Sequence, residues 1–313
     1  MNPIAQLAIV QIGVPLVLIV LNAIVPAASW WALGMRALLL GLGLAWLVLG
    51  GLWLYPPWWT PFVMVVFALL SLIPPILRLS RGGASRRPWR RWSETAIVAV
   101  TAVAVLVVLV VPAAAGRTLP RGPVVDLAEP LDPGTYYVAS GGSTIALNRH
   151  LATRDSDTWR GQSRGVDLVK VDSLGRRAHG IAPENPEDYF IFGEPVIAPC
   201  VGSVVATRDD LVDQRVPQVD RENPAGNYVL LQCGASQVLL AHLRQRSVVV
   251  KQGDRVELGT LLGRVGNTGN SSEPHLHLHA QRPSTDSAEP FAGEPEWITI
   301  EGHFPIRNRL MRL

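Results

Sequence analysis

The chain has 313 residues, a net charge of +3, 48% hydrophobic residues and a mean hydropathy of +0.23. These averages conceal two different halves. The chain is almost entirely apolar before residue 116, whereas charged residues, proline and glycine are as frequent after it as in a soluble domain. The composition therefore excludes a single soluble domain. Nucleic acid is not expected as a partner, because the basic residues of the apolar half gather in one loop between apolar segments, where membrane topology explains them.

Four apolar segments are predicted to cross a lipid bilayer as helices. They cover residues 4–25, 31–54, 59–77 and 95–114, and each offers about the 20 apolar residues that a hydrocarbon core requires. The first is not expected to be a cleaved signal peptide, because it lacks a basic leading region and further apolar segments follow it. Residues 1–115 are thus predicted to form an all-α transmembrane region of four spans.

The orientation follows from the arginines. Six lie between the third and fourth segments before the first acidic residue, Glu94: Arg78, Arg81, Arg86, Arg87, Arg90 and Arg91. The positive-inside rule places this loop in the cytoplasm, so the last span carries the chain outward. We expect a multi-pass protein of the cytoplasmic membrane whose C-terminal half is extracytoplasmic, on the periplasmic or cell-wall side. Arg36, near the inner end of the second span, is expected to reach the lipid headgroups.

The external half is predicted to be all-β. Residues 116–134 are rich in proline and glycine and are interpreted as a linker. From Tyr136 onward, short β-like runs alternate with turn residues, and no run has a helical period. The predicted organisation is a linker at 116–134, a β domain at 135–300 and a C-terminal tail at 301–313.

The two cysteines, Cys200 and Cys233, both lie in this external half, at the ends of two predicted strands. If those strands pair antiparallel, the two sulfurs come to the same end of the pair. An oxidising compartment would then permit a disulfide. Two buried free thiols are the alternative.

The run HLHLH at residues 275–279 is the most informative stretch of the chain. On a β-strand, alternate side chains share a face, so His275, His277 and His279 lie on one face and the two leucines on the other. Neutral imidazole is the commonest metal ligand in proteins. The run therefore indicates a metal site backed by a hydrophobic core.

Short motifs on either side of this run occur in a distinctive order: GVDL (165–168), FGEPVIAP (192–199), GSVV (202–205), GNYV (226–229), LAHL (240–243), GDRV (253–256), GNTGN (266–270) and PHLH (274–277). In this order and spacing they resemble the lysostaphin/LytM-type zinc metalloendopeptidases, which cut peptide cross-links in bacterial cell walls. The resemblance covers about half of the chain, from residue 135 to residue 282, and implies an antiparallel sheet of the duplicated-hybrid-motif kind.

The resemblance also implies a cofactor, zinc, and roles for particular residues. Asp167 and His277 fall on positions that ligate zinc in this family, and His242 and His275 fall on catalytic positions. Three protein ligands leave a fourth position for water, whose pKa zinc lowers to about 7. The two catalytic imidazoles would exchange protons and steady the oxyanion. His279 is a candidate for a supporting contact behind the metal ligands, although a purely structural role is the simpler interpretation.

One family ligand is missing, because Ser163 stands where a histidine usually precedes the aspartate by four residues. A serine hydroxyl is a poor zinc ligand. Some family members resemble this chain around Asn148, His150 and residues 162–167, so the resemblance suggests His150 as the substitute third ligand, with Asn148 supporting it. His179 is a less favoured substitute, and His303 is assigned no role. The alternative is a degenerate site that holds no zinc.

The sequence thus predicts a membrane-anchored zinc endopeptidase acting on the peptide cross-links of peptidoglycan, with wall-synthesis or wall-hydrolase proteins as further candidate partners. The alternative is a catalytically degenerate domain of the same fold that binds the cell wall or activates another wall hydrolase. A transporter or channel is disfavoured, because the spans contain few polar residues.

Overall fold

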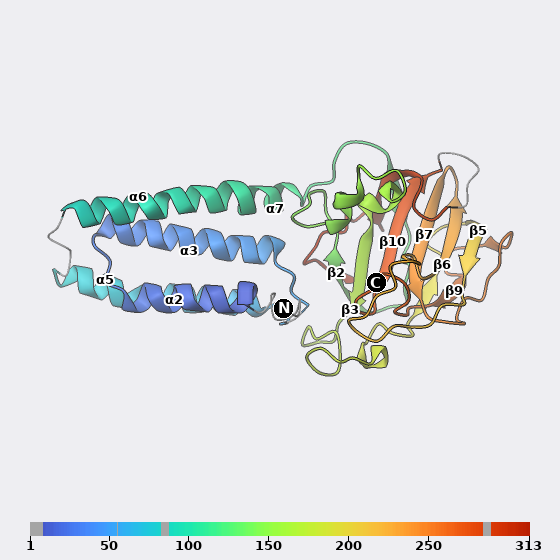
Figure 1. Ribbon diagram of the computed structural model, residues 1–313, viewed down its shortest axis with the longest axis horizontal. Coiled ribbons are helices and arrows are strands. Elements are labelled where there is room, and N and C mark those ends of the chain that lie inside the picture. The colour runs from blue at the N-terminus through green and yellow to red at the C-terminus, as the bar shows by residue number, and fades with distance from the viewer. Residues whose placement is uncertain (1–8, 55, 83–87, 284–288) are drawn as a thin grey trace. The chain divides into compact units, whose positions relative to one another are not determined.

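The computed structural model describes residues 9–313 apart from residues 55, 83–87 and 284–288. It divides into two compact units, Met1–Ala115 and Gly116–Leu313, which Figure 1 shows as a helical part and a β-rich part. Each unit is described by itself below. The helical and β-rich classes agree with the sequence prediction for the two halves.

The described part of the N-terminal unit is helical. Its elements are η1 (Ile9–Gly13), α2 (Val14–Ile24), α3 (Trp30–Gly50), α4 (Thr60–Ser71), α5 (Ile73–Ser80), α6 (Pro88–Val105), η2 (Leu106–Val110) and α7 (Val111–Ala115). Prolines explain two of the breaks. Pro74 and Pro75 occupy the first turn of α5, where a missing N–H costs nothing, and α4 ends just before them.

The expected number of spans is corrected by the helix lengths. Among the described residues, three helices are long and apolar enough to cross a membrane: Trp30–Gly50, Thr60–Ser80 and Trp92–Ala115. The first expected span is a shorter apolar helix, Ile9–Ile24, and residues 4–8 of that span lie outside the described residues. This helix ends where it does because Val25 is already extended, as a residue before proline usually is.

Arginines complete the C-terminal end of α2. Arg78 donates hydrogen bonds to the carbonyl oxygens of Ala23 and Ile24 at 3.3 and 2.9 Å, and Arg36 donates to the carbonyl oxygen of Val25 at 3.0 Å. Arg36 also forms an ion pair with Glu94. The last carbonyl groups of a helix have no partner within it and are costly to leave unpaired in lipid. These guanidinium groups are therefore used in helix–helix contacts.

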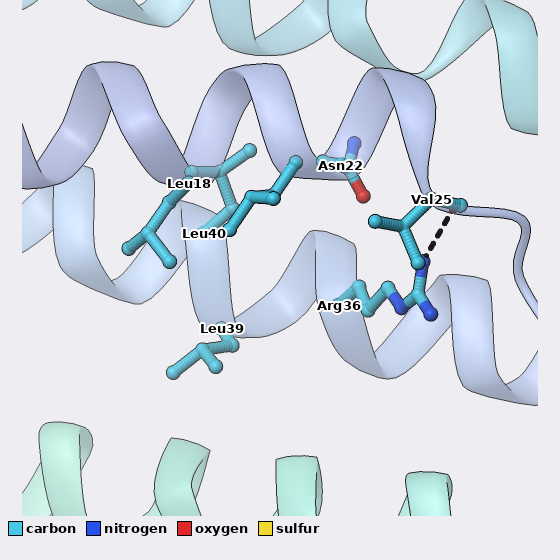
Figure 2. A pocket seen from close by; sticks show the side chains of 7 residues that line it. Leu18, Asn22, Val25, Arg36, Leu39 and Leu40 are labelled. Carbon is cyan, nitrogen blue, oxygen red and sulfur yellow. Dashed lines mark hydrogen bonds between the residues drawn. The ribbon is translucent and has the colours of Figure 1, made fainter.

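Figure 2 shows a cavity of about 260 Å³ between α2 and α3, with Arg36 at one end. It is lined by Leu18, Leu21, Asn22, Val25, Arg36, Leu39 and Leu40. The Asn22 side chain donates to the hydroxyl of Ser71 on α4 at 2.9 Å. The polar members of this lining thus also join neighbouring helices, and the rest of the lining is apolar.

The C-terminal unit is built on one large sheet. Its strands are β1 (Val124–Leu127), β2 (Thr135–Ser140), β3 (Val166–Lys170), β4 (Pro195–Ile197), β5 (Gly202–Arg208), β6 (Asn227–Cys233), β7 (Ser236–Leu243), β8 (Arg255–Val256), β9 (Leu261–Arg264), β10 (Leu276–Arg282), β11 (Glu294–Ile300) and β12 (Leu310–Arg312). Short 3-10 helices η3 (Arg149–Thr153), η4 (Arg160–Arg164) and η5 (Pro186–Asp188) interrupt them.

The sheet is predominantly antiparallel and places β10 near its centre. The strand order is β12-β2-β3-β10-β7-β6-β5-β8, with β11 pairing β10 and, in parallel, β1, while β4 and β9 form a separate pair. Figure 1 shows β3, β10, β7 and β6 side by side. The antiparallel sheet predicted for this half is confirmed.

Two segments that the sequence assigned to a linker and a tail contribute strands. Residues 116–134 contain β1, which pairs with β11, and residues 301–313 contain β12, which pairs with β2. Their short strands extend the sheet at its margins, where pairing depends on neighbours distant in the sequence. Local proline and glycine content gave no sign of that pairing.

A hydrophobic core fills one face of the sheet. Fully buried side chains from neighbouring strands pack together there, among them Leu168, Leu240, Leu276 and Leu278. Cys200 and Cys233 pack against this core and are joined by a disulfide. They lie at one end of the antiparallel β5–β6 pair, Cys200 just before β5 and Cys233 at the end of β6.

Candidate metal centre

The histidine-bearing strand β10 lies between β3 and β7. Leu276 and Leu278 point into the core and are fully buried, so the alternation of a strand places His277 and His279 on the opposite face. In the register of the sheet, His277 stands opposite Asp167 on β3 and Ala241 on β7. The pairing of three strands thus brings two distant motifs to one place.

Three side chains converge on one point beside β10. The Nε2 atom of His150 lies 3.0 Å from each carboxylate oxygen of Asp167, and the Nδ1 atom of His277 lies 2.9 Å from Asp167 Oδ1. One ligand atom from each of the three residues lies within 4.8 Å of the other two. Among the described residues, these three side chains are the ones whose spacing fits a bound metal ion.

His150 reaches this point because Asn148 fixes the segment before it. The Asn148 side-chain oxygen accepts a hydrogen bond from the backbone N–H of His150 at 3.1 Å and so caps η3. Its amide nitrogen donates to the carbonyl oxygen of Gly165, two residues before Asp167, at 3.0 Å. Asn148 therefore ties the helix that carries one candidate ligand to the strand that carries another.

Ser163, which replaces the usual histidine, is also buried at the site. Its side chain is 0% exposed, and its hydroxyl oxygen has no hydrogen-bond partner. It lies on η4, two residues before Gly165, whose α-carbon closely approaches the His277 ring. Ser163 is not among the three grouped residues. The third member of the group is His150, which lies on the other short helix, η3.

His242 is aimed at the site by a β-bulge. On β6, Asn227 pairs with Leu243 and Tyr228 with Ala241, so His242 is the extra residue of β7. Its backbone has a φ of +63°, a left-handed conformation that is uncommon outside glycine. Bulges of this kind redirect side chains next to functional sites. The His242 ring lies 4.7 Å from the ring of His275 and 5.8 Å from that of His277, centre to centre.

The ring orientations of His242 and His275 are set by backbone carbonyl groups. The Nδ1–H of His242 donates to the carbonyl oxygen of Thr268 at 2.8 Å. The Nδ1–H of His275 donates to the carbonyl oxygen of Glu273 at 2.8 Å, and its Nε2 lies 3.6 Å from Asp167 Oδ1. In each neutral ring, Nε2 is left with its lone pair.

Arg177 holds the segment that orients His275. Its guanidinium, on a side chain only 5% exposed, donates to both carboxylate oxygens of Glu273 at 2.8–3.0 Å. Sequence reasoning missed this pair because the two residues lie 96 positions apart and neither belongs to a recognisable motif.

His279 lies directly behind His277. Its Nδ1 is 3.0 Å from Nε2 of His277, and its Nε2 is 3.0 Å from the carbonyl oxygen of Pro290. The ring is fully buried and stacks on Phe291, with 5.7 Å between ring centres. His279 thus contacts the candidate ligand His277 and belongs to no ligand group itself.

Burial and neighbouring charges set the protonation of the site. Desolvation by burial lowers the pKa of His277 to about 4 and holds the pKa of His242 and His279 well below the usual histidine value. Burial alone would raise the pKa of Asp167, but the nearby histidines His150 and His275 and the hydrogen bonds from His150 and His277 outweigh it and leave the pKa well below its usual range. At neutral pH the site therefore combines the Asp167 carboxylate with the neutral rings of His242, His277 and His279.

This donor set fits a divalent cation. Neutral imidazole nitrogen and carboxylate oxygen are ordinary zinc ligands, and three of them with an open position are typical of catalytic zinc sites. His277 Nδ1 and His150 Nε2 both lie within 3.0 Å of the Asp167 carboxylate. A divalent cation beside these atoms would therefore be held by two ring nitrogens and a carboxylate oxygen together.

The structure leaves two other histidines away from this group. His179 is exposed and packs edge-on against Phe190, and His303 lies in an exposed turn after β11. Neither belongs to the metal-ligand group.

Comparisons with known proteins identify the domain. Residues 187–290 match the family model described as peptidase family M23. The matched segment contains His242, His275 and His277, whereas His150 and Asp167 precede it. The chain is 32% identical to the peptidoglycan DD-endopeptidase ShyA of Vibrio cholerae over 146 residues, which are 46% of this chain and 29% of the relative.

Two further similarities involve other proteins. An uncharacterized metalloprotease of Buchnera aphidicola is 40% identical over 53 residues, 17% of this chain and 14% of that protein. The catalytic domain of lysostaphin from Staphylococcus simulans is 25% identical, with 39% of this chain and 68% of that one covered, at a TM-score of 0.26. The chain spans less than a third of the length of the curated relatives it matches. Within the C-terminal unit, residues 187–290 are thus similar to peptidase family M23, and the similarity to the DD-endopeptidase supports the lysostaphin/LytM type expected for this unit.

Proposed function

We propose that this protein is a membrane-anchored zinc metalloendopeptidase that hydrolyses peptide cross-links of bacterial peptidoglycan. The observation that carries the proposal is the convergence of His150, Asp167 and His277 around one point, with the rings of His242 and His275 beside it. The similarity to a peptidoglycan DD-endopeptidase supports the substrate class.

His150 Nε2, an Asp167 carboxylate oxygen and His277 Nδ1 would hold the zinc ion. When bound, zinc supplies Lewis acidity and lowers the pKa of water to about 7. The ligand set contributes one negative charge, from Asp167. The depressed pKa values of Asp167 and His277 keep both in the form that binds metal at neutral pH.

His242 would act as the proton carrier of the reaction. Its Nδ1–H is committed to the Thr268 carbonyl group, so the Nε2 lone pair is the one available to the site. This nitrogen accepts a proton from the attacking water as the new C–O bond forms at the peptide carbonyl carbon. It returns the proton to the amide nitrogen as the C–N bond breaks. His275, fixed by Glu273, presents a second Nε2 to the same region. When this nitrogen carries a proton, it would donate a hydrogen bond to the charge that develops on the carbonyl oxygen.

A groove beside the site would hold the peptide. It has a volume of about 460 Å³ and is lined by aromatic residues, Trp159, Tyr228 and Phe291, and by polar and acidic residues, among them Asp157, Glu222 and Glu289. Phe291 stacks on His279, and Ala225, also in the lining, accepts a hydrogen bond from the backbone of His242. The groove therefore runs up to two of the site histidines, as an extended substrate requires.

The N-terminal unit would anchor the enzyme in the cytoplasmic membrane. The arginine-rich loop before Glu94 favours a cytoplasmic position for that loop and hence an extracytoplasmic position for the domain that follows residue 115. The lipid bilayer and peptidoglycan are the proposed partners, and wall-synthesis or wall-hydrolase proteins are further candidates. The proposed catalytic domain corresponds to residues 135–300, supported by β1 and β12 from its flanks.

Metal analysis tests the ligand set. The full-length protein, purified in detergent and measured by elemental analysis, is expected to hold one zinc ion per chain. His150→Ala and His277→Ala should each lower zinc occupancy at least tenfold at equal free zinc, since each removes one of three ligands. His179→Ala is the matched control, because His179 is exposed and outside the group, and it should keep full occupancy. Unchanged zinc binding in both ligand variants would contradict the proposed site.

Digestion of purified peptidoglycan tests the activity. The wild-type protein should release cross-link fragments, and a chelator or His242→Ala should abolish the release. Absence of release, combined with stimulation of a separate amidase, would instead identify a non-catalytic activator on the same fold.

A further inference from the structure

A continuous line of hydrogen bonds runs from the groove wall to the proposed metal ligand His277. The carbonyl oxygen of Pro290 lies 3.0 Å from Nε2 of His279, and Nδ1 of His279 lies 3.0 Å from Nε2 of His277. The other nitrogen of His277, Nδ1, faces Asp167 Oδ1 at 2.9 Å. Every ring nitrogen along this line has a close partner.

The direction of these hydrogen bonds is fixed at one end. A carbonyl oxygen only accepts, so the Nε2 of His279 must carry a hydrogen and donate it to Pro290. In a neutral imidazole the other nitrogen is then an acceptor, and Nδ1 of His279 receives its hydrogen bond from the Nε2–H of His277. The complete burial of His279 disfavours a charged ring and so agrees with the neutral form.

We propose that His279 is a positioning residue that holds His277 in the Nε2–H tautomer, so that its Nδ1 lone pair faces the metal site. His279 contacts neither the proposed metal position nor the substrate and acts through His277. A ligating histidine usually donates its second N–H to a carboxylate, a backbone carbonyl group or water. Here the second N–H of His277 is donated to another histidine, His279, whose own hydrogen is held on Nε2 by the Pro290 carbonyl group.

The surroundings of His279 keep this line rigid. Its ring stacks on Phe291 at 5.7 Å with an angle of 27° between the planes, and Phe291 in turn packs against Trp159 at 5.5 Å. The backbone of Phe291 accepts a hydrogen bond from Gly161 N–H on η4 at 2.7 Å. The segment that carries Pro290 and Phe291 therefore belongs both to the groove wall and to the support of the metal ligand.

The tautomer of His277 can be measured without any metal or substrate. The full-length chain has seven histidines, so selective ¹⁵N-histidine labelling in detergent micelles, with a His277→Gln spectrum for assignment, isolates its ring nitrogens. For the metal-free wild type, we expect Nε2 of His277 to be protonated and to donate its hydrogen to Nδ1 of His279. A His277 ring that carries no hydrogen on Nε2 would overturn the proposal.

Substitutions at His279 supply the second readout. His279→Phe keeps the aromatic stack on Phe291 but removes the acceptor for His277. It should mix the two tautomers and weaken zinc binding about 10- to 100-fold in competition with a chelator. His279→Asn restores an acceptor oxygen near the Nδ1 position and should recover the wild-type tautomer and most of the affinity. Equal tautomer ratios and zinc affinities in the Phe and Asn variants would overturn the proposal, provided that both variants show the far-UV spectrum of the wild type.

This inference rests on the proposed function only for its catalytic meaning. If the tautomer is as expected and peptidoglycan is not cut, the proposed activity fails while the positioning role of His279 stands. If peptidoglycan is cut and Nε2 of His277 carries no hydrogen, the positioning role fails while the activity stands.

Discussion

At the scale of single residues, the site depends on close contacts between the backbone and the rings of the histidines. Gly165 is the clearest case. A β-carbon at this position would lie 2.6 Å from Cε1 of His277 and 2.9 Å from the carbonyl oxygen of Gln162. The His277 ring cannot move aside easily, because both of its nitrogens are hydrogen bonded within the buried site. Only glycine allows η4 and β10 to meet in this way.

We therefore expect Gly165→Ala to displace His277 and to weaken zinc binding about tenfold or more. Zinc affinity measured by chelator competition on the full-length protein checks this. Gly263→Ala is the matched control, because its nearest contact for an added β-carbon is 3.3 Å, and it should bind zinc nearly as the wild type does. Equal affinity in the two variants would mean that the close approach at Gly165 has no influence on the site.

At the scale of elements, pairing between strands places the residues and the Cys200–Cys233 disulfide secures one end of the sheet. The bond joins the start of β5 to the end of β6 across 33 positions of the chain. Because a cross-link limits the conformations of the unfolded chain, a loop of this length stabilises the fold by about 3–4 kcal/mol in the loop-entropy model. The metal residues lie on β3, β10 and η3, none of which carries a cysteine.

Replacing both cysteines by serine should therefore lower the free energy of unfolding of the C-terminal unit by about 3–4 kcal/mol and leave zinc stoichiometry unchanged. Denaturant unfolding of the full-length protein, followed by near-UV circular dichroism, measures the first quantity. A reductant should destabilise the wild type to the same extent and have no effect on the double variant. A double variant as stable as the oxidised wild type would contradict the expected contribution.

At the scale of the whole molecule, the buried histidines make stability depend on pH. His242, His277 and His279 have depressed pKa values in the folded protein because burial disfavours the charged ring. The unfolded chain binds protons at these residues near the ordinary histidine pKa of about 6.5. Between that value and the folded pKa, the unfolded state holds more protons, so the free energy of unfolding falls as the pH falls.

For the metal-free protein we expect thermal stability to be constant above about pH 7 and to fall between pH 6.5 and pH 4. The lowered pKa of Asp167 adds a further loss below the ordinary aspartate value of 3.8. Calorimetry across this range measures the effect, and His279→Asn should reduce the slope because it removes one of the three rings. A flat profile between pH 7 and pH 5 would show that the buried histidines are charged in the folded state or already neutral when unfolded.

The sequence predicted the features that follow from the pattern of neighbouring residues. Alternation along β10 correctly indicated that Leu276 and Leu278 face the core, and the order of the motifs indicated a resemblance to lysostaphin/LytM-type peptidases, which the comparisons support. Three of the four expected spans correspond to helices long enough to cross a membrane, and the first corresponds to the shorter apolar helix Ile9–Ile24, before which residues 4–8 lie outside the described part of the chain. Assignment of residues 116–134 and 301–313 to a linker and a tail overlooked two strands, since β1 and β12 are short and pair with distant partners.

The amino-acid sequence by itself determined the apolar helical half, the β-rich half, and the residue types available for a metal site, because hydropathy and strand alternation are properties of neighbouring residues. Only the tertiary structure decided that His150 meets Asp167 and His277, that a bulge turns His242 toward them, and that His279 lies between His277 and the Pro290 carbonyl group. Each of these depends on contacts between segments far apart in the chain. Such contacts form when the sheet closes its hydrophobic core and leave no local pattern in the sequence.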